Sequence, residues 1–366
     1  MPYPQHPPHL PLAGRLASLD GWRAFSIILV LGSHCIRSNG FPAELLPVFS
    51  IFDGSLGVRM FFIISGFLIT WLMLKEKETT GSISLKNFYI RRALRILPVY
   101  YTFLLALLLL QIFTPFSQQP VHWLGNLTFT TNFTGATWSS GHLWSLAVEE
   151  QFYFLWPGVF CITSRINTRL TMLVLAFPVI VAPLIRVVIC KNWHPASLNG
   201  FINHYSFIAN FDSLAFGCIS AFLLYHKSEM LQNCFLKHHW RIMLAAVLLM
   251  IAPYFLAYMK IPARLLAFSG ASLQAIGFSV LMLNSVLFPA RLGNNLLNLK
   301  YCVRLGVLSY SIYIWHQIFC TNPATFGLGN NMWMSFPLWI LSSLATATVS
   351  YYCLERPILN LRHRFR

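Results

Sequence analysis

The sequence predicts an all-α, polytopic membrane protein with about ten transmembrane helices and both termini in the cytoplasm. Three observations predict this class. Apolar residues make up 56% of the 366 residues, and only 10% are charged, against about 25% in soluble domains. The mean hydropathy is +0.60. The apolar residues are also grouped into long segments. This composition excludes a disordered chain and argues against a soluble enzyme, because too little charge remains to cover its surface.

Ten apolar segments are candidates for membrane spans, since a helix needs about 20 mainly apolar residues to cross the bilayer. Several are short and need flanking residues to span, and the first, which carries three ionisable residues, is the least apolar. The ten segments are Trp22–Cys35, Leu56–Leu74, Ile96–Phe113, Leu146–Thr163, Thr171–Ile189, Ile208–Tyr225, Ile242–Tyr258, Leu265–Phe288, Leu305–Cys320 and Pro337–Cys353.

The distribution of Lys and Arg predicts the orientation. With the N-terminus in the cytoplasm, nineteen of the 26 Lys and Arg residues fall on the inner side of the ten segments and five on the outer side. This bias is the one described by the positive-inside rule, and it places both termini inside. The net charge of +16 therefore follows topology, and we predict no nucleic-acid partner. The predicted location is a bacterial inner membrane.

The chain divides into three predicted regions. Residues 1–18 contain five prolines and no apolar core, so we expect a disordered cytoplasmic tail. Residues 19–357 form one transmembrane domain, and residues 358–366 form a basic cytoplasmic tail. The eight cysteines are scattered, without metal-ligand spacing, and most lie in apolar segments. We therefore predict neither a disulfide nor a metal site.

Ionisable residues in the first segment are the main functional candidates, because a charge at the bilayer centre costs about 2.5–3.5 kcal/mol. Arg23 and His34 are eleven residues apart, about 20° past three helical turns, so they share one face of the helix. His34, in the outer half, is a candidate general base. The alternative is structural: Asp20 and Arg23 cap the helix, and His34 bonds to a neighbour.

The fourth segment contains the adjacent residues Glu149 and Glu150. Their side chains point about 100° apart on a helix, so at most one is expected to share a polar cavity with His34. Three residues near the outer end of this segment are candidate substrate contacts: His142, Trp144 and Ser145. For Trp144 and Ser145, the alternative is an aromatic belt at the membrane interface.

Arg92 and Arg95, before the third segment, are neighbours on a helix at the predicted inner face. They suit an anionic cytosolic ligand such as a nucleotide phosphate; anchoring at the inner face explains them equally well. Three further candidate substrate contacts are Arg59 and Ser65 in the second segment and His316 in the ninth. Interface anchoring is the alternative for Arg59, and close helix packing for Ser65.

Three other acidic and basic residues are interpreted as structural. Arg186 and Asp212 face each other in the predicted topology, and we expect an intramembrane ion pair. Glu355, at the end of the tenth segment, is expected to be a partner for inner-face arginines rather than a catalyst.

Taken together, these residues resemble the acyltransferase-3 family of integral-membrane O-acyltransferases, from Leu19 to Pro357. Each matching piece is weak alone, and six in the right order are strong. The pieces are Leu19-Asp20-Gly21-Trp22-Arg23 with His34, Phe61–Leu68, Arg92-x-x-Arg95, His142–Tyr153, Tyr310-Ser311-x-Tyr313-x-x-His316 and Glu355-Arg356-Pro357. Trp22 and Ala24 depart from commoner residues of the family, which alters packing at most.

The resemblance implies transfer of an acyl group, usually acetyl, from cytoplasmic acyl-CoA to a hydroxyl of an extracytoplasmic glycan. That glycan would be a surface polysaccharide, a lipopolysaccharide or a lipid-linked sugar. The expected partners are acyl-CoA, the glycan or glycolipid acceptor and membrane lipid; no cofactor is expected to stay bound, and the oligomeric state is left open. No SGNH-type domain follows the tenth segment within this sequence, so we expect the membrane domain, alone or with a partner, to complete the transfer.

The resemblance also implies roles for the candidates. The essential histidine of the family matches His34, its arginine matches Arg23, and its span-four glutamate matches Glu149. We predict catalytic roles for these three and for Asp20, and CoA binding by Arg23 with the paired arginines. The main alternative is a proton-coupled transporter or flippase that uses His34 and Glu149 as a relay. That alternative explains the buried ionisable residues but not the arginine pair.

Overall fold

The computed structural model describes residues 16–191, 206–291 and 293–361. Over these ranges the chain is helical and contains no β-strand beyond a single bridge between Asn39 and Ser335. The predicted all-α class is therefore confirmed for the described part. Most of both predicted tails, residues 1–15 and 362–366, lies outside it. Of the remaining tail residues, Ala17 and Ser18 already belong to the first helix.

Each of the ten predicted apolar segments falls on a helix. These helices are α1 (Ala17–Cys35), α3 (Gly54–Thr80), α4 (Leu85–Phe113), α7 (Leu143–Ile166), α8 (Thr168–Lys191), α10 (Phe207–His226), α11 (Ser228–Tyr258), α12 (Ala263–Leu287), α14 (Lys300–Phe319) and α15 (Leu338–Ser350). A π-helical turn, η5 (Tyr351–Glu355), joins α15 to α16 (Arg356–Leu361). The short elements are η1 (Ala43–Leu45), α2 (Leu46–Phe49), α5 (Pro120–Leu127), α6 (Thr131–Thr134), η2 (Trp138–Ser140), α13 (Asn294–Leu297), η3 (Pro323–Phe326) and η4 (Met332–Met334).

Five helical stretches of the described chain are long and apolar enough to cross a membrane. They are Ala43–Thr80, Leu85–Phe113, Thr168–Cys190, Phe207–Tyr258 and Ala263–Leu287. The total of ten spans and the cytoplasmic position of the termini stay predictions.

Local sequence signals explain where several helices start and stop. The carboxylate of Asp53 accepts hydrogen bonds from the backbone N–H groups of Ser55 and Leu56 and caps α3, as short polar side chains do at helix N-termini. Ser84 caps α4 in the same way. Gly81 ends α3 with a φ of 74°, which suits glycine because it has no Cβ.

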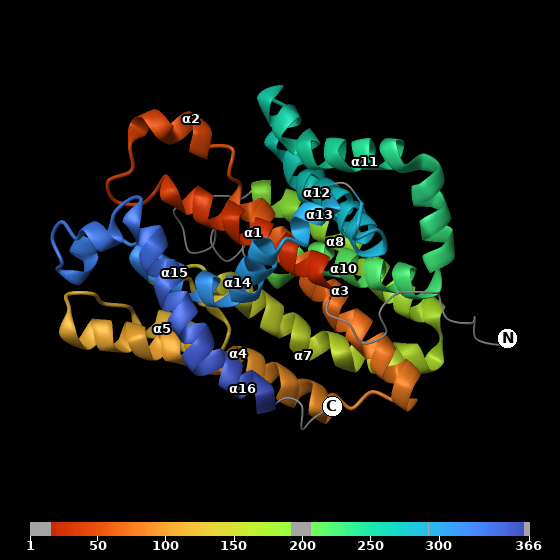
Figure 1. The fold of residues 1–366 in the computed structure, drawn as a ribbon, viewed down its shortest axis with the longest axis horizontal. Coiled ribbons are helices and arrows are strands. Elements are labelled where there is room, and N and C mark those ends of the chain that lie inside the picture. Colours follow the sequence, from red (N-terminus) through yellow and green to blue (C-terminus); the bar gives the residue numbers. More distant parts are fainter. Residues whose placement is uncertain (1–15, 192–205, 292, 362–366) are drawn as a thin grey trace.

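Small residues bring the central helices into close contact. A Cβ added at Gly66 of α3 would lie 2.1 Å from the carbonyl oxygen of Leu214 in α10, and one at Gly217 would lie equally close to the carbonyl of Ile63. The two backbones therefore touch, which small residues allow in membrane proteins. Figure 1 shows α1 crossing the middle of the molecule, with α3 and α14 beside it. This arrangement surrounds the candidate residues of α1 with helices.

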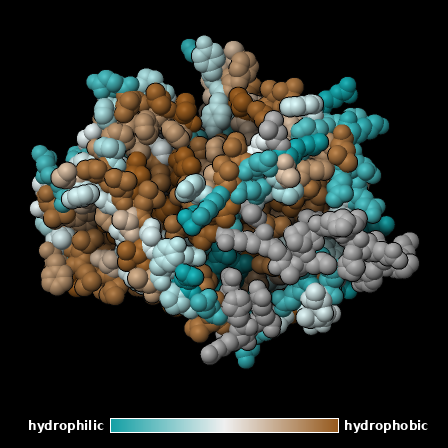
Figure 2. All heavy atoms as spheres, viewed as in Figure 1, coloured by the Kyte–Doolittle hydropathy of each residue, from teal (hydrophilic) through white to brown (hydrophobic). Residues whose placement is uncertain are grey.

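The surface is largely apolar. Figure 2 shows broad hydrophobic areas on the face in view, and large side chains such as Phe113, Phe154 and Trp240 are more than two-thirds exposed. Soluble monomers rarely expose apolar patches of this extent, so this surface fits contact with lipid.

Candidate active site

A cavity of about 80 Å³ opens among α1, α3, α4, α7 and α14. Its lining combines polar groups with an apolar wall that includes Val58, Phe61 and Phe62. Six predicted site residues line it: Arg23, Arg92, Arg95, Glu149, Ser65 and Ser145. Candidates from four segments thus meet in one place. Glu149 lines the cavity and Glu150 is not among its lining residues, which answers which of the two glutamates faces it.

Glu149 is held by a chain of hydroxyl groups. Tyr153 donates its phenolic hydrogen to Ser65 Oγ at 3.0 Å, and Ser65 donates to Glu149 Oε1 at 2.6 Å. Ser65 therefore does more than allow helix packing: it fixes the carboxylate on the wall of the cavity. Both donors are buried, so the arrangement is sheltered from competing water.

The three cavity arginines carry more hydrogen-bond donors than the protein uses. Arg23 pairs with Asp20 at 3.6 Å, three residues earlier on α1. Arg92 lies over the rings of Phe88 and Tyr153. Among the described residues, neither Arg92 nor Arg95 forms an ion pair. Guanidinium groups lining a cavity in this way can bind phosphate or carboxylate.

Three imidazoles form a second cluster near the outer ends of α1, α7 and α14. His316 Nε2 lies 2.9 Å from His34 Nδ1, and the two rings stack with their centroids 4.9 Å apart. The ring of His142 lies edge-on to that of His316, with the centroids 5.3 Å apart. His142 and His316 are buried, whereas His34 is only partly buried. We name these three residues the imidazole cluster.

The hydrogen bonds fix which nitrogen of His34 is basic. His316 Nδ1 lies 2.7 Å from the carbonyl oxygen of Tyr313, and a carbonyl can only accept, so this nitrogen carries a hydrogen. In neutral His316, Nε2 must then be the acceptor. His34 therefore donates from Nδ1, which leaves its Nε2 with the lone pair. The tautomer follows from the hydrogen-bond network.

Tyr313 separates the cavity from the imidazole cluster. It lines the cavity, its hydroxyl lies 2.6 Å from Ser145 Oγ, and it donates to the carbonyl of His142 at 3.1 Å. Its ring is 5.6 Å from that of His316. His34 is not a lining residue of the cavity, so the base and the arginines lie on opposite sides of one tyrosine.

The structure corrects one expectation about His34. Its described hydrogen-bond partner is His316, and the described partner of Glu149 is Ser65. Glu149 is thus not the orienting partner of His34, because the two lie in different clusters. The relay required by the transporter alternative also lacks a described contact between them. His316, expected as a substrate contact, takes the orienting position instead.

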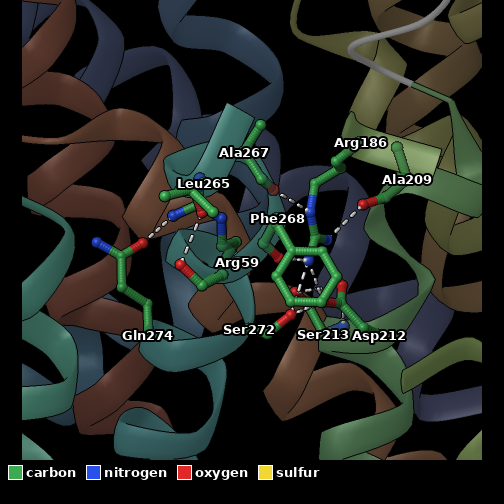
Figure 3. A network of polar contacts seen from close by, with 11 residues as sticks. Arg59, Arg186, Ala209, Asp212, Ser213, Leu265, Ala267, Phe268, Ser272 and Gln274 are labelled. Atoms are coloured by element: carbon green, nitrogen blue, oxygen red, sulfur yellow. Dashed lines mark hydrogen bonds and ion pairs between the residues drawn. The ribbon is translucent and has the colours of Figure 1, made fainter. Parts of the chain in front are cut away.

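Two further candidates lie away from the cavity. Trp144 is not among its lining residues, and its ring contacts Phe62 edge-on. Arg59 hydrogen-bonds to Gln274 of α12 and belongs to a separate polar region, shown in Figure 3. The expectation that Arg59 contacts substrate at this site is therefore wrong in position.

The same view contains the expected ion pair of Arg186 and Asp212, at 2.9 Å (Figure 3). Arg186 also donates to Ser272 and to the carbonyl oxygens of Ala209 and Ala267, so α8, α10 and α12 are tied together. The guanidinium is saturated by protein acceptors. This region is a structural clamp, as the sequence predicted.

Glu355 is buried and lies close enough to Arg95 for an electrostatic interaction. No ion pair within 4.0 Å joins it to an arginine in the described chain. The predicted partnership with inner-face arginines is thus electrostatic rather than a direct contact.

Sequence reasoning left three tyrosines of the site without a role. Tyr153, Tyr310 and Tyr313 all line the cavity. Tyr313 precedes His316 by three residues, a spacing that puts both on one face of a helix. That spacing was the available signal for Tyr313. Within the described residues, no group of three or more His, Cys, Asp or Glu is placed to hold a metal ion.

Comparison with known proteins identifies the family. The family profile Acyl_transf_3, described as an acyltransferase domain, matches residues 16–355. The chain belongs to the acyltransferase-3 family. This membership confirms the predicted family and enzyme class, and it fits a multi-pass membrane protein.

Two relatives align with nearly the whole chain. Peptidoglycan O-acetyltransferase OatA of Listeria monocytogenes is 26% identical over 372 residues, which cover 93% of this chain and 55% of the relative. YrhL of Bacillus subtilis, provisionally named a peptidoglycan O-acetyltransferase, is 26% identical over 374 residues, or 94% and 55%. This acyltransferase-3 chain thus spans about half the length of these relatives. No solved structure matches it significantly.

Proposed function

We propose that this protein is a membrane O-acetyltransferase that moves an acetyl group from acyl-CoA to a hydroxyl of a cell-envelope glycan. One observation carries the proposal: an arginine-lined cavity lies directly beside an imidazole cluster with a basic nitrogen. Family membership supports acyl transfer. The names of the two relatives support acetyl as the group and peptidoglycan as the glycan class.

On the donor side, Arg23, Arg92 and Arg95 hold the phosphates of acyl-CoA. This role is supported by their position on one cavity and by guanidinium donors that the described residues leave without an anion, apart from the Asp20 pair of Arg23. Asp20 is a positioning residue for Arg23. The apolar wall formed by Val58, Phe61 and Phe62 suits the acyl arm, and Glu149 and Ser65 offer polar contacts along it.

On the acceptor side, His34 Nε2 removes the proton of the attacking hydroxyl. The hydroxyl oxygen bonds to the thioester carbon, the carbon–sulfur bond breaks, and the CoA thiolate leaves and takes up a proton. His34 Nδ1–H donates to His316 throughout, so the imidazolium that forms is oriented and stabilised. His316 and Ser145 act by positioning His34 and Tyr313, and Tyr313 must move aside for donor and acceptor to meet.

Replacement of His34 tests the proposal. We expect His34→Ala to lower acetyl transfer from acetyl-CoA to peptidoglycan fragments by about 10²–10⁴-fold, the usual contribution of a general base. His122→Ala is the matched control, because His122 lies on α5 and is not part of the site. Transfer and acetyl-CoA consumption are measured with equal amounts of membrane-inserted protein.

Wild-type transfer by the His34 variant would exclude His34 as the base. Glycan movement without acetyl-CoA consumption by the wild-type protein would contradict enzyme function and favour the transporter.

A further inference from the structure

Arg37 and Trp138 lie beside His34 on its accessible side. Arg37 follows His34 by three residues, and its backbone N–H donates to the His34 carbonyl. The Trp138 ring lies edge-on to the His34 ring, with the centroids 5.6 Å apart. The guanidinium carbon of Arg37 lies 5.5 Å from the centre of the Trp138 ring. Both side chains are exposed. We name this pair, Arg37 and Trp138, the outer platform.

The outer platform is held rigidly from below. Gln317, next to His316, donates to the backbone carbonyl of Trp138 at 2.5 Å. The two following residues of η2 are buried: Ser139 Oγ lies 3.3 Å from Thr321 Oγ1, and Ser140 donates to Gln118 at 2.8 Å. The exposed indole is therefore fixed to the same helix that orients the candidate base. Such preorganisation is what a ligand site requires.

The cation of the outer platform has no anionic partner in the described chain. No ion pair or side-chain hydrogen bond of Arg37 is present among the described residues. Residues 114–145 and 320–337, which pass beside it, contain no Lys, Arg, Asp or Glu. A guanidinium stacked on an aromatic ring keeps its in-plane N–H donors available, and these match a carboxylate or phosphate bidentately.

We infer that the outer platform is the acceptor subsite and that it recognises an anionic glycan. Arg37 pairs with a carboxylate or phosphate next to the acceptor sugar, and Trp138 packs against the sugar. The hydroxyl to be acylated is thereby presented to His34 Nε2. This inference rests on the proposed function for its chemistry, and it adds the charge class of the acceptor and two residues that select it.

Direct binding tests the inference. The full-length protein, purified in detergent, is titrated with three probes: an oligoglucuronate, the same oligosaccharide with its carboxyls reduced to alcohols, and a polyprenyl-phosphate-linked glucose. We expect Arg37→Gln to weaken binding of the anionic probe about tenfold or more, because hydrogen bonds to charged groups are among the strongest. Binding of the reduced oligosaccharide should not change. Arg264→Gln, an exposed arginine elsewhere, is the matched control.

The probes distinguish the sources of the anion. A loss confined to the oligoglucuronate assigns a carboxylate, and a loss confined to the polyprenyl-phosphate probe assigns a phosphate. Equal binding of all three probes by wild type and Arg37→Gln overturns the inference, as does an equal loss in Arg264→Gln or no binding by the wild-type protein. Arg37-dependent binding without any acetyl transfer would instead leave the subsite standing and contradict the proposed function.

Discussion

Two regions of this protein bury arginines in different ways. At the structural clamp, Arg186 donates to Asp212, Ser272 and two backbone carbonyls, so its donors are engaged by protein. At the cavity, Arg92 and Arg95 contribute charge to an open space and form no ion pair in the described chain. The sequence presents all of these as charges in or beside apolar segments.

The difference teaches how to separate structural from functional charges in a membrane protein. A buried charge is costly unless it is paired and hydrogen-bonded. The clamp meets that condition within the chain and so has nothing left to offer a ligand. The cavity leaves donors for an anion from outside. Mutations should therefore affect stability at the clamp and binding at the cavity.

The largest effect is expected at the clamp. Asp212→Ala leaves the buried guanidinium of Arg186 without its carboxylate, and we expect a loss of about 3–5 kcal/mol in the free energy of unfolding. Thermal or denaturant unfolding of the purified protein measures it. The double variant Arg186→Met with Asp212→Leu is the control, since an apolar pair should be close to neutral there. Full stability of Asp212→Ala would show that the pair is not a clamp.

An intermediate effect is expected at the cavity. Arg92→Gln should raise the KM for acetyl-CoA about tenfold, because one charge-assisted hydrogen bond to a phosphate is lost. Stability should change by about 1 kcal/mol at most, the size of the lost contact with the Tyr153 ring. Steady-state kinetics and thermal unfolding check the two parts. A large loss of stability with an unchanged KM would make Arg92 structural, like Arg186.

The smallest effect is expected at the hydroxyl chain. Ser65→Ala removes the hydrogen bond to Glu149, and we expect kcat/KM to fall several-fold, in line with about 1 kcal/mol for one such bond. Ser55→Ala, an exposed position at the start of α3, is the control. An unchanged kcat/KM in Ser65→Ala would mean that the orientation of Glu149 does not matter for transfer.

Much of the fold could be predicted from the sequence because membrane insertion imposes strict rules. A span needs a long apolar segment, and every one of the ten predicted segments falls on a helix. The same rules singled out the charges: Arg186 and Asp212 were predicted as a pair, and Arg23, Arg92, Arg95 and Glu149 as site residues that now line one cavity.

Contacts between helices could not be predicted in this way. Helical spacing states which residues of one helix share a face, but it does not state which face of another helix meets it. His34 and His316 are 282 residues apart, and their contact depends on how α1 and α14 pack. The same packing assigned Glu149 to Ser65 rather than to His34, and it put Arg59 beside Gln274.

By itself, then, the sequence determined the helical segments, the charges worth examining and the family resemblance, because hydrophobicity, charge and local motifs are properties of the chain. The tertiary structure decided which nitrogen of His34 is basic, which glutamate faces the cavity, and that Arg37 and Trp138 flank the candidate base. The physical reason is that hydrogen bonds and ring contacts act over a few ångströms, so they depend on packing between distant segments.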